Sequence, residues 1–354
     1  MHRAFLLLLS ILLSLGSSFS ARIPAIIVFG DSTVDTGNNN RIPTVLKSNF
    51  RPYGRDFIGG RPTGRFCNGR LATDFISEAV GLGPVVPAYL DPSYSIRDFA
   101  TGVCFASAGT GLDNATSDVL LYVVFQGVIP LWREVEYFKD YQKKLRRYLG
   151  REKTKYVISE AIYIISIGTN DFLENYFAFV TGRFKQFTVD QYEDFLIGLA
   201  GEFIRKIYWL GARKISFTGL SPMGCLPLER TTNVLNGHGC IEEYNKVARD
   251  FNVKLQASIE ELCASLPGLR LRYNAVYERS LTIIQNPSLY GLENVREGCC
   301  ATGKYEMGYL CNEWDPHTCA DANKYMFWDS FHPTEKVNRL MAISTLNTSL
   351  AEFV

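Results

Sequence analysis

After residue 20, the chain of 354 residues has no apolar stretch long enough to cross a bilayer, which takes about 20 residues. It also has almost no net charge, because 37 Lys and Arg side chains are balanced by 36 Asp and Glu side chains. A chain without an excess of positive charge is not expected to bind nucleic acid through bulk charge. No linker, internal repeat or break in composition divides the sequence, so we expect one domain.

The cysteines lack the Cys-x-x-Cys pairs that are typical of zinc sites, and we therefore predict no metal site. All nine cysteines follow residue 20, and in an oxidising compartment such residues form disulfides. An odd count leaves at least one thiol unpaired in a monomer. We expect bridges in two regions, with the connectivity left open: around Cys225 and Cys240, and among Cys299, Cys300, Cys311 and Cys319.

The first residues, "MHRAFLLLLSILLSLGSSFSA", combine a basic start, an unbroken apolar run and the small residues Ser18 and Ser20. This pattern is typical of a secretory signal peptide, and we expect cleavage near Ala21. Residues 1–20 are then the signal, and residues 21–354 form the single domain. A membrane anchor is the alternative, but the apolar run is short for a span of about 20 residues.

Two further features fit the secretory route. Asn114 in "NAT" and Asn347 in "NTS" are acceptor sequences for N-linked glycans, and both should lie at the surface. No terminus of the Lys-Asp-Glu-Leu type is present. We therefore expect a secreted protein, extracellular or in the cell wall, with the vacuole as the other possible destination.

Short apolar runs alternate with longer segments of helical periodicity along the chain. This alternation predicts an α/β fold, in which helices cover both faces of a parallel sheet. The expected strands are 25–29, 102–106, 161–167, 214–220 and 269–275. The clearest expected helices are 68–81, 130–149, 188–210, 241–265 and 333–346, the last with Pro333 at its first position.

Three of the expected strands end in polar residues, and the ligands of open parallel sheets bind outside the carboxyl ends of the strands. These ends read "GDS" (30–32), "SAGTG" (107–111) and "GTND" (168–171). Ser32 in the first of them is the candidate nucleophile. It does not lie in a Gly-x-Ser-x-Gly pentapeptide, which the chain lacks altogether, so the usual α/β-hydrolase arrangement is disfavoured.

A nucleophilic serine needs a base, usually histidine, and a third group that orients the base. The chain has only four histidines, and His2 lies in the predicted signal. His332 lies in "FWDSFHPTE" with Asp329 three residues earlier, a spacing that lets the carboxylate reach one ring nitrogen while the other points to a serine. The alternative is a turn in which this pair only caps the following helix. His238 and His317 are interpreted as loop residues.

Acyl transfer also needs hydrogen-bond donors for the oxyanion of the tetrahedral intermediate. The candidates are the backbone N–H groups of Ser32 and Gly109 and the side-chain amide of Asn170. Taken singly, Gly109 could only form a tight turn, and Asn170 could only cap the segment that follows it. The convergence of all three on one sheet edge favours an oxyanion hole.

At this point the chain resembles the plant GDSL esterase/lipase family, which is part of the SGNH hydrolase superfamily. The resemblance extends over nearly the whole chain after the signal. Its motifs are "FGDSTVDTGNNN" (29–40), "RPTGRFCNGR" (61–70), "GVCFASAGTG" (102–111), "IGTND" (167–171), "GLSPMGCLP" (219–227) and "FWDSFHPTE" (327–335).

The resemblance implies that Ser32, Asp329 and His332 form a catalytic triad, with Gly109 and Asn170 as oxyanion donors beside the backbone of Ser32. It implies a three-layer α/β/α sandwich with a flavodoxin-like sheet, and no metal or organic cofactor. One departure is Cys104, where many relatives have Asn; from it we expect different local packing and a thiol near the site.

We therefore expect a secreted serine ester hydrolase that acts on a small-molecule or polymeric acyl ester. The alternatives are an acyltransferase that uses the same acyl-enzyme with an alcohol acceptor, and a binding protein on a hydrolase scaffold.

Two other sequence signals are not interpreted as functional sites. "GCCATGKY" (298–305) lacks the Ser or Thr of a nucleotide-binding loop, and the arginine-rich stretch 51–70 is interpreted as a loop pinned by hydrogen bonds to carbonyl groups.

Overall fold

The computed structural model describes residues 23–119, 127–178 and 181–354. The predicted signal peptide, residues 1–20, lies outside these described ranges.

The centre of the fold is a five-stranded parallel sheet in the order β2-β1-β3-β4-β5. This is the flavodoxin-like order, and it confirms the predicted fold class. All five expected strands are present: β1 (Ile26–Gly30), β2 (Gly102–Cys104), β3 (Ile162–Ser166), β4 (Lys214–Thr218) and β5 (Arg270–Asn274). β1 is shifted by one residue from its predicted range, and the other four are shorter than predicted.

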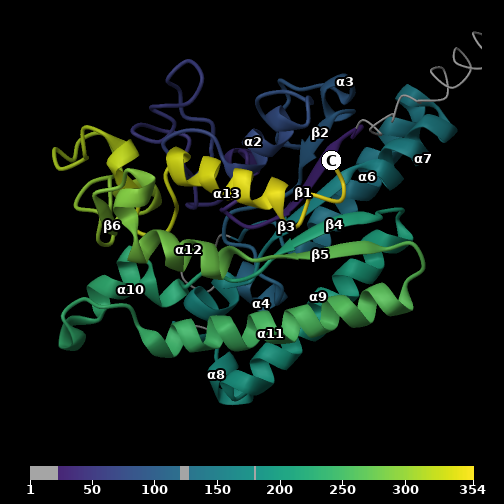
Figure 1. The fold of residues 1–354 in the computed structure, drawn as a ribbon. Coiled ribbons are helices and arrows are strands. Elements are labelled where there is room, and N and C mark those ends of the chain that lie inside the picture. Colours follow the sequence, from purple (N-terminus) through teal and green to yellow (C-terminus); the bar gives the residue numbers. More distant parts are fainter. Residues whose placement is uncertain (1–22, 120–126, 179–180) are drawn as a thin grey trace, which may run out of the picture.

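Alternate residues of the strands enter two different apolar cores, which makes the fold three-layered. On β1, Ile27 and Phe29 pack into the core formed with α6, α9 and α11, while Ile26 and Val28 pack into the core formed with α2 and α13. Figure 1 shows α13 on one side of the sheet and the long helices α9 and α11 on the other. These helices are α2 (Ala72–Ala79), α6 (Leu131–Leu149), α9 (Val189–Trp209), α11 (Glu242–Ser265) and α13 (Glu335–Asn347).

The five expected helices are thus present, but Pro333 does not open the last of them. Pro333 instead forms an isolated antiparallel bridge with Phe327, and the Thr334 N–H donates to the carbonyl of Met326 at 3.0 Å. Because these two residues are held in extended conformation, α13 begins only at Glu335, with Thr334 as its N-cap.

The remaining elements were not predicted from the sequence. In the described ranges, the α-helices and strands among them are α3 (Ile96–Phe99), α4 (Asn114–Ser117), α7 (Arg151–Glu160), α8 (Arg183–Gln186), α10 (Pro227–Thr232), α12 (Val276–Gln285) and a separate parallel pair, β6 (Asn294–Gly298) and β7 (Tyr325–Phe327).

Three disulfides lie in the two predicted regions: Cys225–Cys240, Cys299–Cys319 and Cys300–Cys311. The "GCCATGKY" segment therefore belongs to a disulfide-closed loop. Three cysteines are free, namely Cys67, Cys104 and Cys263.

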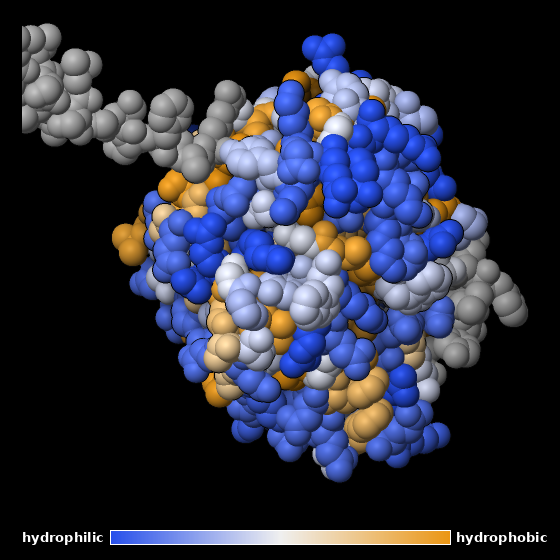
Figure 2. All heavy atoms as spheres, turned by 90° about the vertical axis from the view of Figure 1, so that its right-hand side faces the viewer, coloured by the Kyte–Doolittle hydropathy of each residue, from blue (hydrophilic) through white to orange (hydrophobic). Residues whose placement is uncertain are grey.

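The face of the molecule at which the strands begin is largely polar (Figure 2). Figure 2 views the molecule from the end at which the strands begin; hydrophilic side chains cover most of this face, and hydrophobic ones appear only in scattered places. Asn114 and Asn347 are both exposed, as expected for glycan acceptors. In the described part of the chain, no helix combines the length and the apolar character that a membrane span needs.

The arginine-rich loop is pinned from inside by Arg65. This guanidinium forms two 2.8 Å hydrogen bonds with the carboxylate of Asp74 and also donates to the carbonyl groups of Thr36 and Val86 at 3.1 and 3.0 Å. Arg65 is 4% exposed and Asp74 is fully buried. The loop is therefore attached to α2 and to the segment after β1 by one charge-assisted network.

We predict that Arg65→Ala lowers the free energy of unfolding by about 3–5 kcal/mol, because Asp74 would remain buried without its charge partner. Urea denaturation measures this loss. The matched control is Arg41→Ala, since the Arg41–Asp91 pair is solvent-accessible and its removal costs about 0–1 kcal/mol. Equal losses in the two variants would contradict the importance of the buried pair.

Candidate active site

The carboxyl ends of β1, β2 and β3 lie side by side because β1 is the neighbour of both other strands. In this strand order, the chain turns to opposite faces after β1 and β3, and ligands bind in the crevice between such strands. The polar segments that follow β1, β2 and β3 are therefore brought to one edge of the sheet.

Gly30 sets the direction in which the chain leaves β1. Its φ is +138°, and a Cβ atom here would lie 1.9 Å from the carbonyl oxygen of Ser166 on β3. Only glycine fits this close approach. The next N–H, that of Asp31, donates to the same Ser166 oxygen at 3.0 Å, and the half-buried Ser32 follows at the sheet edge.

Ser32, His332 and Asp329 form one hydrogen-bonded chain. Ser32 Oγ lies 2.8 Å from His332 Nε2, and His332 Nδ1 lies 2.9 Å from each carboxylate oxygen of Asp329. Asp329 Oδ1 also accepts the backbone N–H groups of Phe331 at 2.9 Å and His332 at 2.7 Å, which fixes the turn before α13. A pair that merely capped the helix would not require the contact between Nε2 and Ser32.

The asparagine-rich loop joins the end of β1 to the segment after β2. The Asp35 carboxylate accepts the backbone N–H of Ala108 at 3.1 Å. The side-chain amides of Asn38 and Asn39 donate to the carbonyl groups of Cys104 and Ala108, each at 3.0 Å. The loop therefore fixes the backbone that leads into Gly109.

The Cys104 thiol is buried and contacts the loop after β1 through a hydrogen bond. Its buried Sγ–H donates to the Val34 carbonyl at 3.2 Å, and the side chain belongs to the core beneath α2 and α13. The departure from the usual Asn thus affects packing.

Gly109 and Asn170 both present donors at this edge. Gly109 has φ +87°, and a Cβ there would lie 2.6 Å from Leu46 Cδ1. The Asn170 amide gives one N–H to the carbonyl of Thr110 at 3.0 Å, which leaves its second N–H available. Among the described residues, the backbone N–H groups of Ser32 and Gly109 have no hydrogen-bond acceptor.

Asn170 is followed by a π-helical turn, Asp171–Tyr176. This turn contains Glu174, a carboxylate that the sequence analysis missed. Asp171 anchors the turn by accepting the N–H groups of Leu112 and Asp113 at 2.8 and 3.0 Å. Glu174 lies one turn beyond Asn170, is half-buried and has no hydrogen-bond partner among the described residues. Burial, followed by the charge of Asp31, raises the pKa of Glu174 to about 7, while the nearby His332 opposes this shift.

Two more carboxylates lie under the end of β1. Burial raises the pKa of Asp31 to about 6, against the hydrogen bonds that it accepts from Thr33. Glu134 Oε2 accepts the Gly30 N–H at 3.0 Å, and burial holds the pKa of Glu134 well above its usual value. Nothing in the sequence around Glu134 distinguishes it from a surface residue of α6, because the contact joins positions 104 residues apart.

A mainly apolar cavity of about 160 Å³ adjoins the site between the sheet, α2 and α13. Both sequence neighbours of Ser32, Asp31 and Thr33, line it, and so do both neighbours of His332, Phe331 and Pro333. The site therefore combines a polar sheet edge with an adjoining apolar space. Within the described ranges, His, Cys, Asp and Glu side chains form no group of three or more that could hold a metal ion.

A sequence profile of the GDSL-like Lipase/Acylhydrolase family matches residues 26–344. The chain belongs to this family. The matched region begins at β1 and ends within α13, so it contains every residue of the hydrogen-bonded chain described above.

Individual family members are similar over almost their full length. Two Arabidopsis thaliana proteins, GDSL esterase/lipase At2g04570 and GDSL esterase/lipase At4g26790, are 57% and 59% identical over 350 residues, which cover 99% of this chain and 98% of each relative. A third, GDSL esterase/lipase At2g42990, is 58% identical over 332 residues, covering 94% of this chain and 93% of the relative.

The raised pKa values of Asp31 and Glu174 predict how stability depends on pH. Their ordinary values are 3.8 and 4.5, so between about pH 4 and pH 7 the native state binds more protons than the unfolded state. The stabilisation is complete below this range and is lost as pH rises through it. We expect a higher melting temperature near pH 5 than near pH 7.5.

The measurement is thermal unfolding across this pH range for the wild type and for Glu174→Gln. The variant should show a smaller decrease in melting temperature with rising pH. Glu261→Gln, which changes an exposed carboxylate on α11, is the matched control and should keep the wild-type slope. An unchanged slope in Glu174→Gln would contradict the prediction.

Proposed function

We propose that this GDSL-family protein is a secreted carboxylic ester hydrolase that works through an acyl-enzyme on Ser32. Its membership of the lipase/acylhydrolase family supports ester hydrolysis. The single observation that carries the mechanism is the 2.8 Å contact between Ser32 Oγ and His332 Nε2, with Asp329 on the other ring nitrogen.

In the first half of the reaction, His332 Nε2 takes the proton of Ser32 as Oγ attacks the carbonyl carbon of the ester. Asp329 holds the Nδ1–H side of the ring and stabilises the imidazolium that forms. The oxyanion is stabilised by the backbone N–H groups of Ser32 and Gly109 and by the free amide N–H of Asn170. His332 then protonates the leaving alcohol, and the acyl group remains on Ser32.

In the second half, water enters and gives a proton to His332 Nε2 while its oxygen attacks the acyl carbon. Collapse of the second tetrahedral intermediate breaks the bond to Ser32 Oγ, which recovers the proton from His332. The carboxylic acid leaves. An alcohol in place of water would complete an acyl transfer by the same steps, and a competing alcohol in the assay distinguishes the two products.

We also infer that the protein reaches an oxidising compartment outside the cytosol. Residues 1–20 have the composition of a signal peptide. Three disulfides and the exposed glycan acceptors Asn114 and Asn347 are consistent with that route. Extracellular space, cell wall and vacuole all meet these conditions.

Ser32→Ala tests the nucleophile. We predict a loss of about 10⁴- to 10⁶-fold in kcat on p-nitrophenyl acetate, because no acyl-enzyme can form, with an unchanged melting temperature. Thr33→Ser, which alters the neighbouring hydroxyl residue while keeping its hydroxyl group, is the control and should retain activity. A folded Ser32→Ala protein with near-wild-type activity would rule out the acyl-enzyme on Ser32.

The adjoining cavity predicts the size of the acyl group. A cavity of about 150 Å³ holds one benzene molecule, so about 160 Å³ accommodates roughly six carbon atoms. We expect kcat/KM for p-nitrophenyl esters to be highest for acyl chains of about two to six carbons and to decline toward palmitate.

A variant links this profile to the cavity. Ala72 on α2 lines the cavity, so Ala72→Leu should lower kcat/KM for hexanoate about tenfold while acetate hydrolysis stays unchanged. The matched control is Ala264→Leu on the exposed face of α11. A parallel loss on both esters, or a profile that rises up to palmitate, would place the acyl chain elsewhere.

A further inference from the structure

Among the residues that the structure describes, Asp329 has one side-chain partner besides His332. The hydroxyl of Tyr53 donates to Asp329 Oδ2 at 2.7 Å, across 276 positions of sequence. Both side chains are fully buried. A buried carboxylate depends on protein donors because no water replaces them, so the loss of this donor would leave Oδ2 with only the imidazole as its partner.

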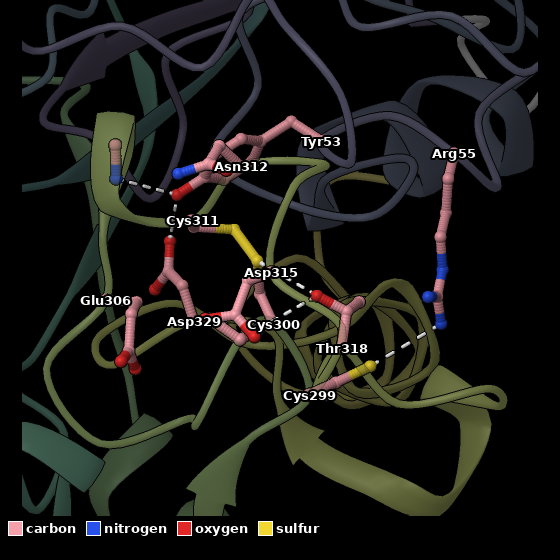
Figure 3. Close-up of a disulfide and its surroundings, with 12 residues drawn as sticks. Tyr53, Arg55, Cys299, Cys300, Glu306, Cys311, Asn312, Asp315, Thr318 and Asp329 are labelled. Carbon is pink, nitrogen blue, oxygen red and sulfur yellow. Dashed lines mark hydrogen bonds between the residues drawn. A yellow bond between two sulfur atoms is a disulfide. The ribbon is translucent and has the colours of Figure 1, made fainter.

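The Tyr53 proton is directed at Asp329 by a second hydrogen bond. The backbone N–H of Gly308 donates to the Tyr53 oxygen at 2.9 Å. The Tyr53 hydroxyl therefore accepts one hydrogen bond from Gly308 and donates one to Asp329 (Figure 3). Burial, followed by the charge of Asp329, holds the pKa of Tyr53 well above its usual value. The phenol therefore stays protonated and always has its one proton to give.

Aromatic packing holds the ring of Tyr53, and a disulfide holds the loop that contains its donor Gly308. The Tyr53 ring makes edge-to-face contacts with Phe66 and Trp328, at centroid distances of 5.9 and 6.1 Å. Gly308 lies in the loop closed by Cys300–Cys311, where the Cys311 N–H donates to the Gly308 carbonyl at 2.9 Å. Figure 3 shows this disulfide beside the Tyr53–Asp329 contact.

We propose that Tyr53 is a positioning residue of the triad: its hydroxyl fixes Asp329, and the Cys300–Cys311 loop fixes the hydroxyl through Gly308. This inference rests on the proposed esterase mechanism. Tyr53 touches neither the substrate nor the reacting atoms. It acts through Asp329, which in turn orients the imidazole of His332 toward Ser32.

The proposal has a consequence for the pH profile. The Tyr53 hydrogen bond stabilises the pair most when Asp329 is charged and His332 is neutral. It stabilises the pair less when the two side chains share one additional proton, so removal of the donor favours the state with the additional proton. The pair then holds that proton to higher pH, and the acid limb of the kcat/KM profile moves upward.

Other titratable groups near the pair must be separated from this effect. Asp31 and Glu174 interact with His332 and have pKa values of about 6 and about 7, in the same range. Cys67 interacts electrostatically with Tyr53 and Asp329, but burial raises the pKa of its thiol, so Cys67 stays neutral. The profile is therefore measured in wild-type and Glu174→Gln backgrounds, since a shift due to Tyr53 must appear in both.

The test is Tyr53→Phe, assayed on p-nitrophenyl acetate with the intact disulfides. We expect kcat to fall about ten- to a hundredfold with KM changed less than about twofold, and the acid limb to move up by about one pH unit. The control is Tyr141→Phe, which removes another buried hydroxyl, one that donates to the Phe99 carbonyl in the core. It should leave kcat and the pH profile unchanged.

A wild-type kcat and acid limb in Tyr53→Phe would overturn the proposal, as would the same shift in Tyr141→Phe. If the esterase mechanism itself were wrong, Ser32→Ala would retain activity. This result distinguishes a failure of the mechanism from a failure of the Tyr53 proposal. If Tyr53→Phe does not fold, Cys300→Ala/Cys311→Ala provides a second route, and it should move the acid limb in the same direction. In a folded triple variant, Tyr53→Phe should add no further shift to the double variant, whereas additive shifts would contradict coupling through Gly308.

Discussion

The close approach of β1 to β3 at Gly30 is the constraint on which the rest of the candidate site depends. With the Ser166 carbonyl where a Cβ atom would otherwise lie, the chain must turn away from the sheet at this point, and it presents Ser32 as it does so. The strand order then brings the segments after β2 and β3 to the same edge. Gly109 and Asn170 reach this edge without any long loop, because each follows its strand by only a few residues.

Several buried carboxylates lie at this edge, and each has a different set of hydrogen-bond donors. Asp35 accepts backbone N–H groups from its own loop and from Ala108, so it connects two strand ends. Glu134 accepts only the Gly30 N–H, and its other oxygen has no partner among the described residues. Burial raises the pKa of Asp31, Asp35 and Glu134, so it favours the protonated form of each carboxyl group.

The five strands could be predicted because short, mostly apolar runs alternate with helical segments. The residues at the strand ends could be selected because ligands of open parallel sheets bind outside the carboxyl ends of the strands. Asp329 and His332 could be paired because they lie three positions apart. Tyr53 and Glu134 could not be found in this way: their contacts join residues 276 and 104 positions apart, and each looks locally like an ordinary loop or helix residue. The prediction that Pro333 opens the last helix was wrong for a related reason. Pro333 pairs with Phe327, a residue of the small β6–β7 sheet, and this sheet was not predicted from the sequence.

The proposed nucleophile and its base lie 300 positions apart, near opposite ends of the folded region. A ribosome therefore completes the entire central sheet before it adds His332 and the helix that follows. Until then, the emerging polypeptide carries the proposed nucleophile without its base. Under the proposed mechanism, ester hydrolysis requires His332, so the order of residues along the chain delays the activity until synthesis is nearly finished.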